Sequence, residues 1–393
     1  MAMITLALAG KPNCGKSTLY RAATMAHADI QNYPFTTIDA NFGVGYVRVP
    51  CACHDLGISC GHCSDGIRYI PINLIDVAGL VPDAHSGKGL GNQFLDNLRQ
   101  ADAIINVIDA SGGTDLEGNP DEIGFHDPVE EIDLVRYEMA MWLYGIIHKH
   151  WARMQRQAQA QQKLFSLEIS VAEVLAGLSI SEQDVLDAQT ASGIRLKTAN
   201  DEELIKFSKE LLRIAKPIIV VGNKTDIAPE NLIAQLQEKK ISLASGAAEL
   251  ALRSAAQAHL IKYNPGDDFF AIPDPSQLSD AQKKGLETIA SYMKRFSGTG
   301  VQAILNHAVF DLLHMIVVYP VEDENQYMDK KGRILPDAFL IKKGSNPHDL
   351  AYMVHSDIGD GFLYAVNART KMRIKESYEL ENGDIIRIVS TAK

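Results

Sequence analysis

Short runs of apolar residues, each ending at a polar or glycine-containing segment, recur along the chain. One run covers residues 4–9, and others end at Asp76, at Asp109 and at Asn223. Continuous apolar runs of this length are typical of strands that are buried on both faces. The stretch from residue 17 to residue 25 is compatible with a helix. This alternation of strands and helix predicts an α/β fold.

The apolar positions change to a helical spacing from about Asp127 to Ala215. Residues three and four apart are then apolar, as in helices with one buried face. These positions include Ile132, Val135, Met139, Leu143, Ile146 and Ile147. Pro128 suits the first turn of the first helix. We expect two long helices that form a coiled-coil arm, inserted between two parts of the strand-containing region.

One stretch of this arm contains basic residues and no acidic residue. Between Met139 and Leu167 they are Lys149, Arg153, Arg156 and Lys163. Such a group is commonly a solvated helix face, and it is also suited to contact the phosphate backbone of RNA. Both interpretations stay open from the sequence.

The last part of the chain, roughly residues 316–393, has the pattern of short strands. They are expected at residues 338–342, 361–366 and 384–390, the last after an Asn-Gly turn signal at 382–383. Four cations alternate along a strand-like stretch, namely Arg369, Lys371, Arg373 and Lys375. Alternate residues of a strand share a face, which predicts a basic patch suited to RNA.

Composition favours a folded, soluble protein over a disordered or membrane-spanning one. The chain has 393 residues, 46% of them hydrophobic and 22% charged, which favours two or three folded domains over a disordered chain. Its net charge of −11 argues against coating nucleic acid through bulk charge. No apolar run reaches the roughly 20 residues that span a bilayer, and the N-terminal run resembles a buried strand more than a signal peptide. We expect a cytoplasmic protein without membrane contact.

Residues 10–17 read GKPNCGKS and satisfy GxxxxGK[ST] between a predicted strand and a predicted helix. In this motif, backbone N–H groups surround the phosphates of a nucleotide. Lys16 is expected to reach the β- and γ-phosphate oxygens, and the Ser17 hydroxyl to bind Mg²⁺. A glycine-rich turn that binds no ligand is the alternative, and the further motifs weaken it.

Two further motifs follow in the order that nucleotide hydrolases require. Asp76 and Gly79 form DxxG, in which the carboxylate can hold a Mg²⁺-bound water and the glycine N–H can meet the γ-phosphate. Residues 223–226 form NKxD. The two oxygens of Asp226 match the N1–H and the exocyclic amine of guanine. Adenine lacks this donor pair and would leave the carboxylate unpaired.

Weaker signals complete the expected site. A threonine hydroxyl at position 36 or 37 can complete the Mg²⁺ shell, and the loop at 245–247 can close over the base with a backbone N–H. The expected nucleotide contacts are Gly10, Lys11, Pro12, Asn13, Cys14, Gly15, Lys16, Ser17, Thr18, Thr37, Asp76, Gly79, Asn223, Lys224, Asp226, Ser245 and Gly246.

The residue after DxxG indicates slow hydrolysis. Many GTPases carry a glutamine there to orient the attacking water, but this chain has Leu80. Another group must therefore orient the water, or a partner must supply one. His85, in a glycine-rich segment, is one candidate, and His126 is less well placed. Asn13 resembles the asparagine of GTPases that hold K⁺ beside the phosphates. The expected catalytic residues are Lys16, Asn13, Gly79 and His85, although a surface histidine without a role is the more common case.

Four of the five cysteines, Cys51, Cys53, Cys60 and Cys63, fall within one short segment. The CxC and CxxC pairs can place four thiolates around a structural Zn²⁺ in a hairpin at 50–68. His54 or His62 could replace one cysteine, and free or redox-active thiols are the alternative. The fifth, Cys14, could make nucleotide binding sensitive to oxidation, but packing is the simpler role.

The motifs GKPNCGKST, NYPFTTIDAN, DVAGLVPDAHSGKGLGNQFLDNLR and NKTD together resemble the Obg-related GTPases, and specifically the YchF group in its archaeal form. The segment PDAFLIKKGSNPHDL from residue 336 resembles the start of a TGS domain. The resemblance implies a P-loop NTPase with a Ras-like G domain, a helical insertion and a C-terminal, β-grasp-like TGS domain. It also implies that Thr37, not Thr36, binds the metal.

The family's role points to a ribosome-associated translation factor or a stress-linked regulator. Many YchF proteins carry NxxE and prefer ATP, whereas Asp226 restores the guanine-reading residue, so we expect GTP with ATP as the alternative. A nucleotide-binding scaffold with negligible turnover is a third hypothesis. The expected domains are a G domain at 1–126 and 216–315, the insertion at 127–215 and the TGS domain at 316–393.

Overall fold

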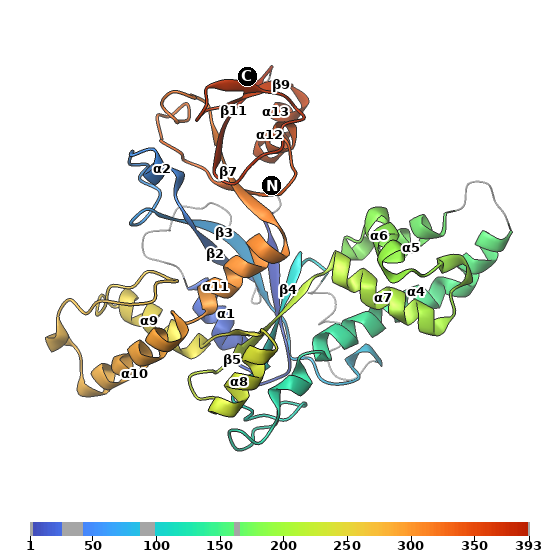
Figure 1. Ribbon diagram of the computed structural model, residues 1–393, viewed down its shortest axis with the longest axis horizontal. Coiled ribbons are helices and arrows are strands. Elements are labelled where there is room, and N and C mark those ends of the chain that lie inside the picture. The colour runs from blue at the N-terminus through green and yellow to red at the C-terminus, as the bar shows by residue number, and fades with distance from the viewer. Residues whose placement is uncertain (1–2, 26–41, 87–98, 161–165, 392–393) are drawn as a thin grey trace. The chain divides into compact units, whose positions relative to one another are not determined.

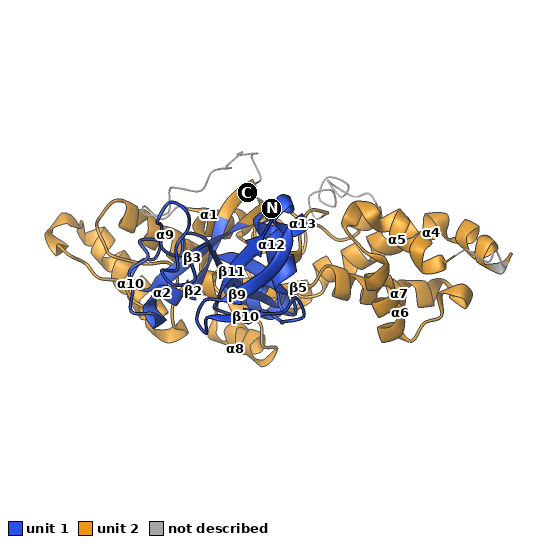
Figure 2. Cartoon of the chain, turned by 90° about the horizontal axis from the view of Figure 1, so that it is seen from above, with its two compact units in different colours: residues 1–4, 45–72, 305–393 blue, residues 5–44, 73–304 orange. Residues whose placement is uncertain are grey.

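The chain folds into two compact units in a computed structural model that describes residues 3–25, 42–86, 99–160 and 166–391. Unit 1 consists of residues 1–4, 45–72 and 305–393, and unit 2 of residues 5–44 and 73–304 (Figure 2). Each unit is therefore built from segments that are far apart in the sequence. Within the described part of the chain, no helix is long and apolar enough to cross a membrane.

A six-stranded sheet carries the predicted motifs, with strand order β2-β3-β1-β4-β5-β6 (Figure 1). Its strands are β1 (Thr5–Ala9), β2 (Phe42–Pro50), β3 (Ile67–Asp76), β4 (Ala103–Asp109), β5 (Ile218–Asn223) and β6 (Ser242–Leu243). β1 pairs in parallel with β3 and β4, and β5 pairs in parallel with β4 and β6. The carboxyl ends of these parallel strands share one edge of the sheet, where ligands bind in open α/β folds. Every residue of β1 and β4 is buried, which explains their uninterrupted apolar sequences.

Unit 2 has further described helices outside the helical insertion. They are α1 (Lys16–Thr24), α8 (Glu230–Glu238), α9 (Gly246–Gln257), α10 (Asp280–Phe296) and α11 (Val301–Asn306), the last of which continues into unit 1. Among them, α10 packs on α9. Shorter helical turns lie at η1 (Ala84–Ser86), η2 (Pro128–Glu131), η3 (Ala176–Leu178), η4 (Leu196–Thr198) and η5 (Pro275–Gln277), and a π-helical segment, η6, at His307–Leu312. The α/β fold that the sequence predicts is confirmed.

The insertion corrects one expectation, because its described residues form one long and three shorter helices and not two long ones (Figure 1). They are α4 (Leu134–Gln159), α5 (Leu167–Leu175), α6 (Glu182–Ser192) and α7 (Asp201–Ala215). Ser166, Ser181 and Asn200 each cap a new helix start with a side-chain oxygen, and Gly193 ends α6 in a left-handed conformation. These local signals divide the periodic stretch. The expected start at Pro128 is confirmed as the helical turn η2, capped by Asp127.

Unit 1 contains a second, five-stranded sheet of order β10-β9-β11-β7-β8. Its strands are β7 (Met315–Val321), β8 (Phe339–Lys342), β9 (Phe362–Asn367), β10 (Met372–Ile374) and β11 (Asp384–Ser390), and its helices are α12 (Pro347–Val354) and α13 (Ser356–Asp360). β7 and β11 are parallel, and the other pairs are antiparallel. The three predicted strands are confirmed within one or two residues. A short helix, α2 (Ala52–Asp55), lies at the tip of the β2–β3 hairpin.

The prediction of four cations along one strand face is wrong. β10 covers only Met372–Ile374, so that Arg369 and Lys371 lie in the preceding turn. Lys371 lies over the ring of Tyr327 at 4.6 Å, and Arg373 lies over that of Tyr364 at 3.9 Å. The alternating pattern is broken because three of these residues form a turn or follow the strand.

Candidate functional site

The loop at residues 10–15 joins the end of β1 to the start of α1, and two of its glycines are required by contact. Gly15 has a φ of +90°, and a Cβ there would lie 2.4 Å from Asn223 Nδ2. A Cβ on Gly10, which has a φ of +144°, would lie 2.2 Å from Val107 O. Side chains at either position would collide with neighbouring strands. The loop is thus pressed against β4 and β5 with its backbone close to the sheet.

Lys16 is held in place within the loop. Its Nζ donates to Lys11 O at 2.7 Å, and the residue is 7% exposed. A phosphate oxygen can replace this carbonyl as the partner of the ammonium. Ser17, the next residue, is exposed at the first turn of α1, where helix N–H groups favour an anion.

The DxxG segment contacts the phosphate loop directly. Leu80 N donates to Gly10 O at 2.9 Å, and a Cβ on Gly79 would lie 2.7 Å from Pro12 Cγ. Asp76 ends β3, and its Oδ1 is buried without a hydrogen-bond partner among the described residues. A buried carboxylate oxygen without a donor suits a Mg²⁺ ion or a water bound to it. Thr37 lies outside the described residues.

The NKxD segment is bound to the phosphate loop through the side chain of Asn223. Asn223 Nδ2 donates to Cys14 O at 3.1 Å and to Gly15 O at 3.3 Å. Its Oδ1 accepts from Gly246 N at 3.0 Å. One side chain thus connects three of the predicted motifs. Asp226, three residues on, is exposed.

The loop after β6 is fixed in the same way. Ser245 caps α9 by accepting from Ala248 N at 3.0 Å, and its own N–H donates to Thr299 O at 2.9 Å. The Gly246 N–H already binds Asn223, and a Cβ on Gly246 would lie 3.1 Å from Leu19 Cα in α1. Ser245 and Gly246 therefore lie beside NKxD, and the closure of this loop over a base stays a prediction.

Asp109, at the end of β4, is a site residue that sequence reasoning missed. Lys224 Nζ donates to its Oδ2 at 2.8 Å, Thr114 Oγ1 donates to the same oxygen at 2.8 Å, and Ser111 Oγ donates to Oδ1 at 2.6 Å. Burial opposes ionisation, but the hydrogen bonds from Lys224 and Ser111 outweigh it and hold the pKa of Asp109 below its usual value. The carboxylate thereby fixes the lysine of NKxD.

Lys11 is expected to contact the nucleotide, but its side chain turns away into the protein. Its Nζ lies 2.8 Å from Glu131 Oε1 and donates to Thr114 O at 2.6 Å. Burial raises the pKa of Glu131 to about 7, against the opposing effect of Lys11. Only the backbone of Lys11 remains to face a phosphate. Nothing in the local sequence marks Glu131, which is 120 residues from Lys11.

Asn13 extends the contact between the phosphate loop and the segment after β4. Its Nδ2 donates to Gly118 O at 2.9 Å, and a Cβ on Gly118 would lie 2.7 Å from Pro12 Cβ. Asn13 has a φ of +59° and is exposed. Its amide nitrogen is committed, so its oxygen is the atom available to a cation. Cys14 is fully buried, and burial raises the pKa of its thiol to about 11, which favours packing over reactivity.

The two candidate histidines differ in their surroundings. His85, in η1, contacts Glu138 of α4 through its ring Nδ1 at 2.7 Å. His126 pairs instead with the exposed Asp121 at 3.2 Å. Leu80 is 2% exposed and packs in the core of unit 2, so it takes no part in orienting water.

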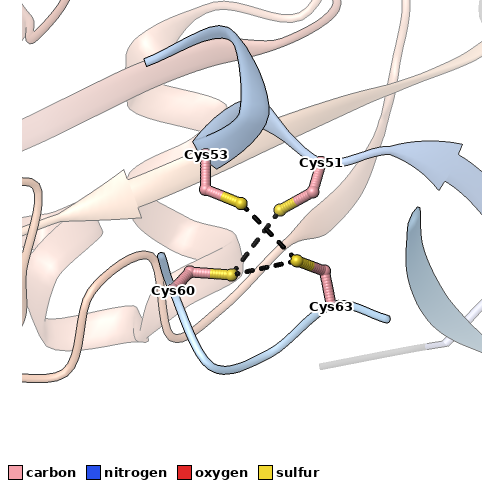
Figure 3. Close-up of side chains that lie close together, drawn as sticks. All are labelled: Cys51, Cys53, Cys60 and Cys63. Carbon is pink, nitrogen blue, oxygen red and sulfur yellow. Dashed lines mark hydrogen bonds between the residues drawn. The ribbon is translucent and has the colours of Figure 1, made fainter. Parts of the chain in front are cut away.

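The four clustered cysteines converge as the sequence predicts (Figure 3). The Sγ–Sγ distances are 3.7 Å for Cys51–Cys60, 3.5 Å for Cys53–Cys63 and 3.6 Å for Cys60–Cys63. Tetrahedral zinc with Zn–S bonds of about 2.3 Å separates its sulfurs by about 3.8 Å. The four sulfur atoms lie within 4.8 Å of one another, so this donor set fits zinc without rearrangement.

The surroundings of the cluster favour the thiolate form of Cys60. Burial alone would raise the pKa of Cys60, but hydrogen bonds from His62 N and the neighbouring thiols hold that pKa below its usual value. Arg68 Nη1 lies 3.9 Å from Cys60 Sγ, and the same guanidinium donates to Leu335 O and Pro336 O at 3.0 and 2.7 Å. Arg68 thus links the cluster to the segment that precedes β8. Neither His54 nor His62 joins the sulfur cluster.

Comparisons with known proteins agree with the fold and the motifs. Residues 5–138 match the family described as a 50S ribosome-binding GTPase, residues 221–323 the Obg-like GTPase YGR210-like, G4 motif-containing domain, and residues 326–390 the TGS domain. An uncharacterized GTP-binding protein of Methanocaldococcus jannaschii is 46% identical over 100% of both chains. The ribosome-binding ATPase YchF of Bacillus subtilis is 31% identical over 98% of both chains. The crystal structure of a GTP-binding protein from Pyrococcus horikoshii covers 99% of this chain and 100% of its own, with 38% identity and a TM-score of 0.78.

Proposed function

The chain belongs to the YchF group of Obg-like GTPases, with a G domain and a C-terminal TGS domain, and we propose that it binds GTP with Mg²⁺ and hydrolyses it slowly to GDP and phosphate. We further propose that the bound nucleotide controls docking on the ribosome or on a translation complex in the cytoplasm. Guanine selection, hydrolysis and docking each have their own supporting observation.

Guanine selection is supported by the arrangement of NKxD. Asn223 fixes this loop to the phosphate loop through two hydrogen bonds and to Gly246 through a third. Lys224 is anchored by Asp109. Asp226 is exposed and has no hydrogen-bond partner among the described residues. A carboxylate free to accept two hydrogen bonds beside a phosphate loop is suited to guanine and not to adenine. This is the observation that carries the proposal of GTP.

Hydrolysis is supported by the residues around DxxG. Mg²⁺ would be held by Ser17, Asp76 and Thr37, and when bound it would neutralise charge on the β- and γ-phosphates. Lys16 and the Gly79 N–H would meet the same oxygens. Asn13 Oδ1 is available to hold K⁺ beside them. His85 is the polar group that would replace the missing glutamine.

Docking is supported by charge on the insertion and by the names of relatives. Lys149, Arg153 and Arg156 are exposed on α4 and lie four and three residues apart, which places them on neighbouring positions of one helix face. Lys163 lies outside the described residues. The B. subtilis relative is named a ribosome-binding ATPase. An exposed cationic helix face free of acids is suited to the phosphate backbone of ribosomal RNA.

A structural Zn²⁺ completes the proposal. Cys51, Cys53, Cys60 and Cys63 would hold it, and it would fix the tip of the β2–β3 hairpin. All four positions around the ion would be filled by sulfur, so it would take no part in hydrolysis.

The alternative is an ATP-preferring enzyme, which the relatives named as ATPases favour. Equilibrium binding of fluorescent GTP and ATP analogues distinguishes the two, and we expect GTP to bind at least tenfold more tightly. Turnover is then measured in K⁺ and in Na⁺, with and without ribosomes. Equal affinities would contradict guanine selection, absent turnover would favour a scaffold, and equal rates in the two salts would exclude a K⁺ role for Asn13.

A further inference from the structure

The buried carboxylate of Glu138 joins the segment after DxxG to the first helix of the insertion. Asp83 N donates to Glu138 Oε1 at 2.8 Å, and His85 N donates to Oε2 at 2.9 Å. The ring Nδ1 of His85 lies 2.7 Å from the same Oε2. Glu138 is 3% exposed. One acid of α4 thus binds three groups of a single turn.

These contacts determine the tautomer of His85. A carboxylate only accepts hydrogen bonds, so the proton of a neutral imidazole must lie on Nδ1. Nε2 is then unprotonated and can accept a proton. The same use of a carboxylate, behind the histidine, orients the general base of acyl-transfer enzymes. The edge-on ring of Tyr137, with its centroid 5.9 Å from that of His85, restricts the imidazole further.

The turn that Glu138 holds begins close to the phosphate loop. Gly79 packs on Pro12 and Leu80 N donates to Gly10 O. Asp83 and His85, which Glu138 binds, follow three and five residues after Leu80. Glu131, one heptad before Glu138, meets Lys11 of the phosphate loop and accepts from Asp109 N at 3.0 Å. The two acids at the start of the insertion therefore contact the P-loop and the turn after DxxG.

We propose that Glu138 is a positioning residue for GTP hydrolysis, which holds His85 with Nε2 ready to accept a proton from the attacking water. This proposal rests on the proposed GTPase activity. As the water oxygen bonds to the terminal phosphorus, the bond from that phosphorus to the bridging oxygen breaks, and its electron pair stays on GDP. Nε2 takes the proton of the water and later releases it to phosphate or solvent. Helix α4 thereby becomes part of the hydrolytic site.

The test compares Glu138→Gln with Glu130→Gln in the full-length protein. Glu130 is an exposed acid eight residues earlier and serves as the matched control. We expect E138Q to bind GTP within about threefold of wild type but to hydrolyse it about tenfold more slowly or worse in single turnover. E130Q should change neither quantity. The His85→Ala, Glu138→Gln double variant should be no slower than His85→Ala alone, because both act through one imidazole.

A second measurement does not depend on turnover. Nitrogen NMR of the histidine side chains in nucleotide-free protein should show His85 protonated at Nδ1 in the wild type and in E130Q, and a mixture of tautomers in E138Q. A positioning role predicts that E138Q changes the tautomer of His85 while the melting temperature stays that of wild type. A merely structural role would not give this combination.

Wild-type turnover in E138Q or in H85A, or additive effects in the double variant, would overturn the proposal while leaving the GTPase activity intact. A wild-type protein that binds but does not hydrolyse GTP would overturn both proposals. If E138Q fails to fold, slow hydrolysis by H85A together with a His85 protonated at Nδ1 in the wild type supports the proposal. A wild-type rate in H85A, or a wild-type His85 protonated at Nε2, overturns it.

Discussion

Lys11 Nζ and Glu131 Oε1 lie 2.8 Å apart, and both side chains are almost fully buried, at 1% and 3% exposure. A lysine of the phosphate loop is thus paired inside the protein with an acid from the start of the insertion. Removing one partner of a buried pair leaves an uncompensated charge, whereas removing both charges together is often neutral. This contrast gives the first two predictions.

At pH 8, Lys11→Met should lower the free energy of unfolding by about 3–5 kcal/mol, because it leaves Glu131 buried without a cation. The double variant K11M/E131Q should recover most of that loss. Denaturant unfolding of the three proteins measures it. A double variant that is as unstable as K11M would show that the hydrogen bond from Lys11 to Thr114 O, and not the charge pair, is what matters.

The pH dependence of stability should report Glu131. Burial raises the pKa of Glu131 from 4.5 to about 7, so the folded protein binds this proton more readily than the unfolded chain does. The contribution of Glu131 to the unfolding free energy therefore falls as the pH rises from about 4.5 to about 7. Without the cation, the fall in K11M should be steeper and extend above pH 7, and K11M/E131Q should lack it. Melting temperatures between pH 5 and pH 8.5 check this, and parallel curves for all three proteins would contradict it.

Asp226→Asn should weaken GTP binding by about 100-fold or more, since two hydrogen bonds to a charged acceptor are worth about 1.5–3 kcal/mol each. ATP binding should change by less than about threefold, so the preference for guanine should largely vanish. Titration with both nucleotides measures this. Asp268→Asn, at another exposed aspartate of unit 2, is the control and should preserve the preference. Equal losses for the two nucleotides would place Asp226 outside the base site.

The purified protein should contain about one equivalent of zinc, because the four sulfurs already lie at tetrahedral spacing. Cys63→Ser should lose most of the metal, while Cys14→Ala, which removes the cysteine outside the cluster, should retain it. Elemental analysis gives the stoichiometry. Chelation should lower the melting temperature of wild type and C14A but leave C63S unchanged. Less than about half an equivalent in wild type would reject the site.

Sequence alone determined the parts of this protein whose chemistry is local. The phosphate loop, DxxG and NKxD each occupy a few adjacent residues, because one strand end and its loop must meet one part of a nucleotide. The CxC and CxxC pairs are local for the same reason, and the structure brings them together. The helix count of the insertion was wrong because three side-chain caps interrupt a continuous apolar periodicity, and such caps are weak signals beside it.

Tertiary structure decided which residues support these motifs. Lys11 meets Glu131, Lys224 meets Asp109, and His85 meets Glu138 across separations of 120, 115 and 53 residues. A single acid on a helix carries no mark of a distant partner, since its charge suits solvent equally well. Only folding removes these acids from water, and burial then requires each to have a cation or hydrogen-bond donors. That requirement, which local sequence does not express, is why the supporting residues became visible only in three dimensions.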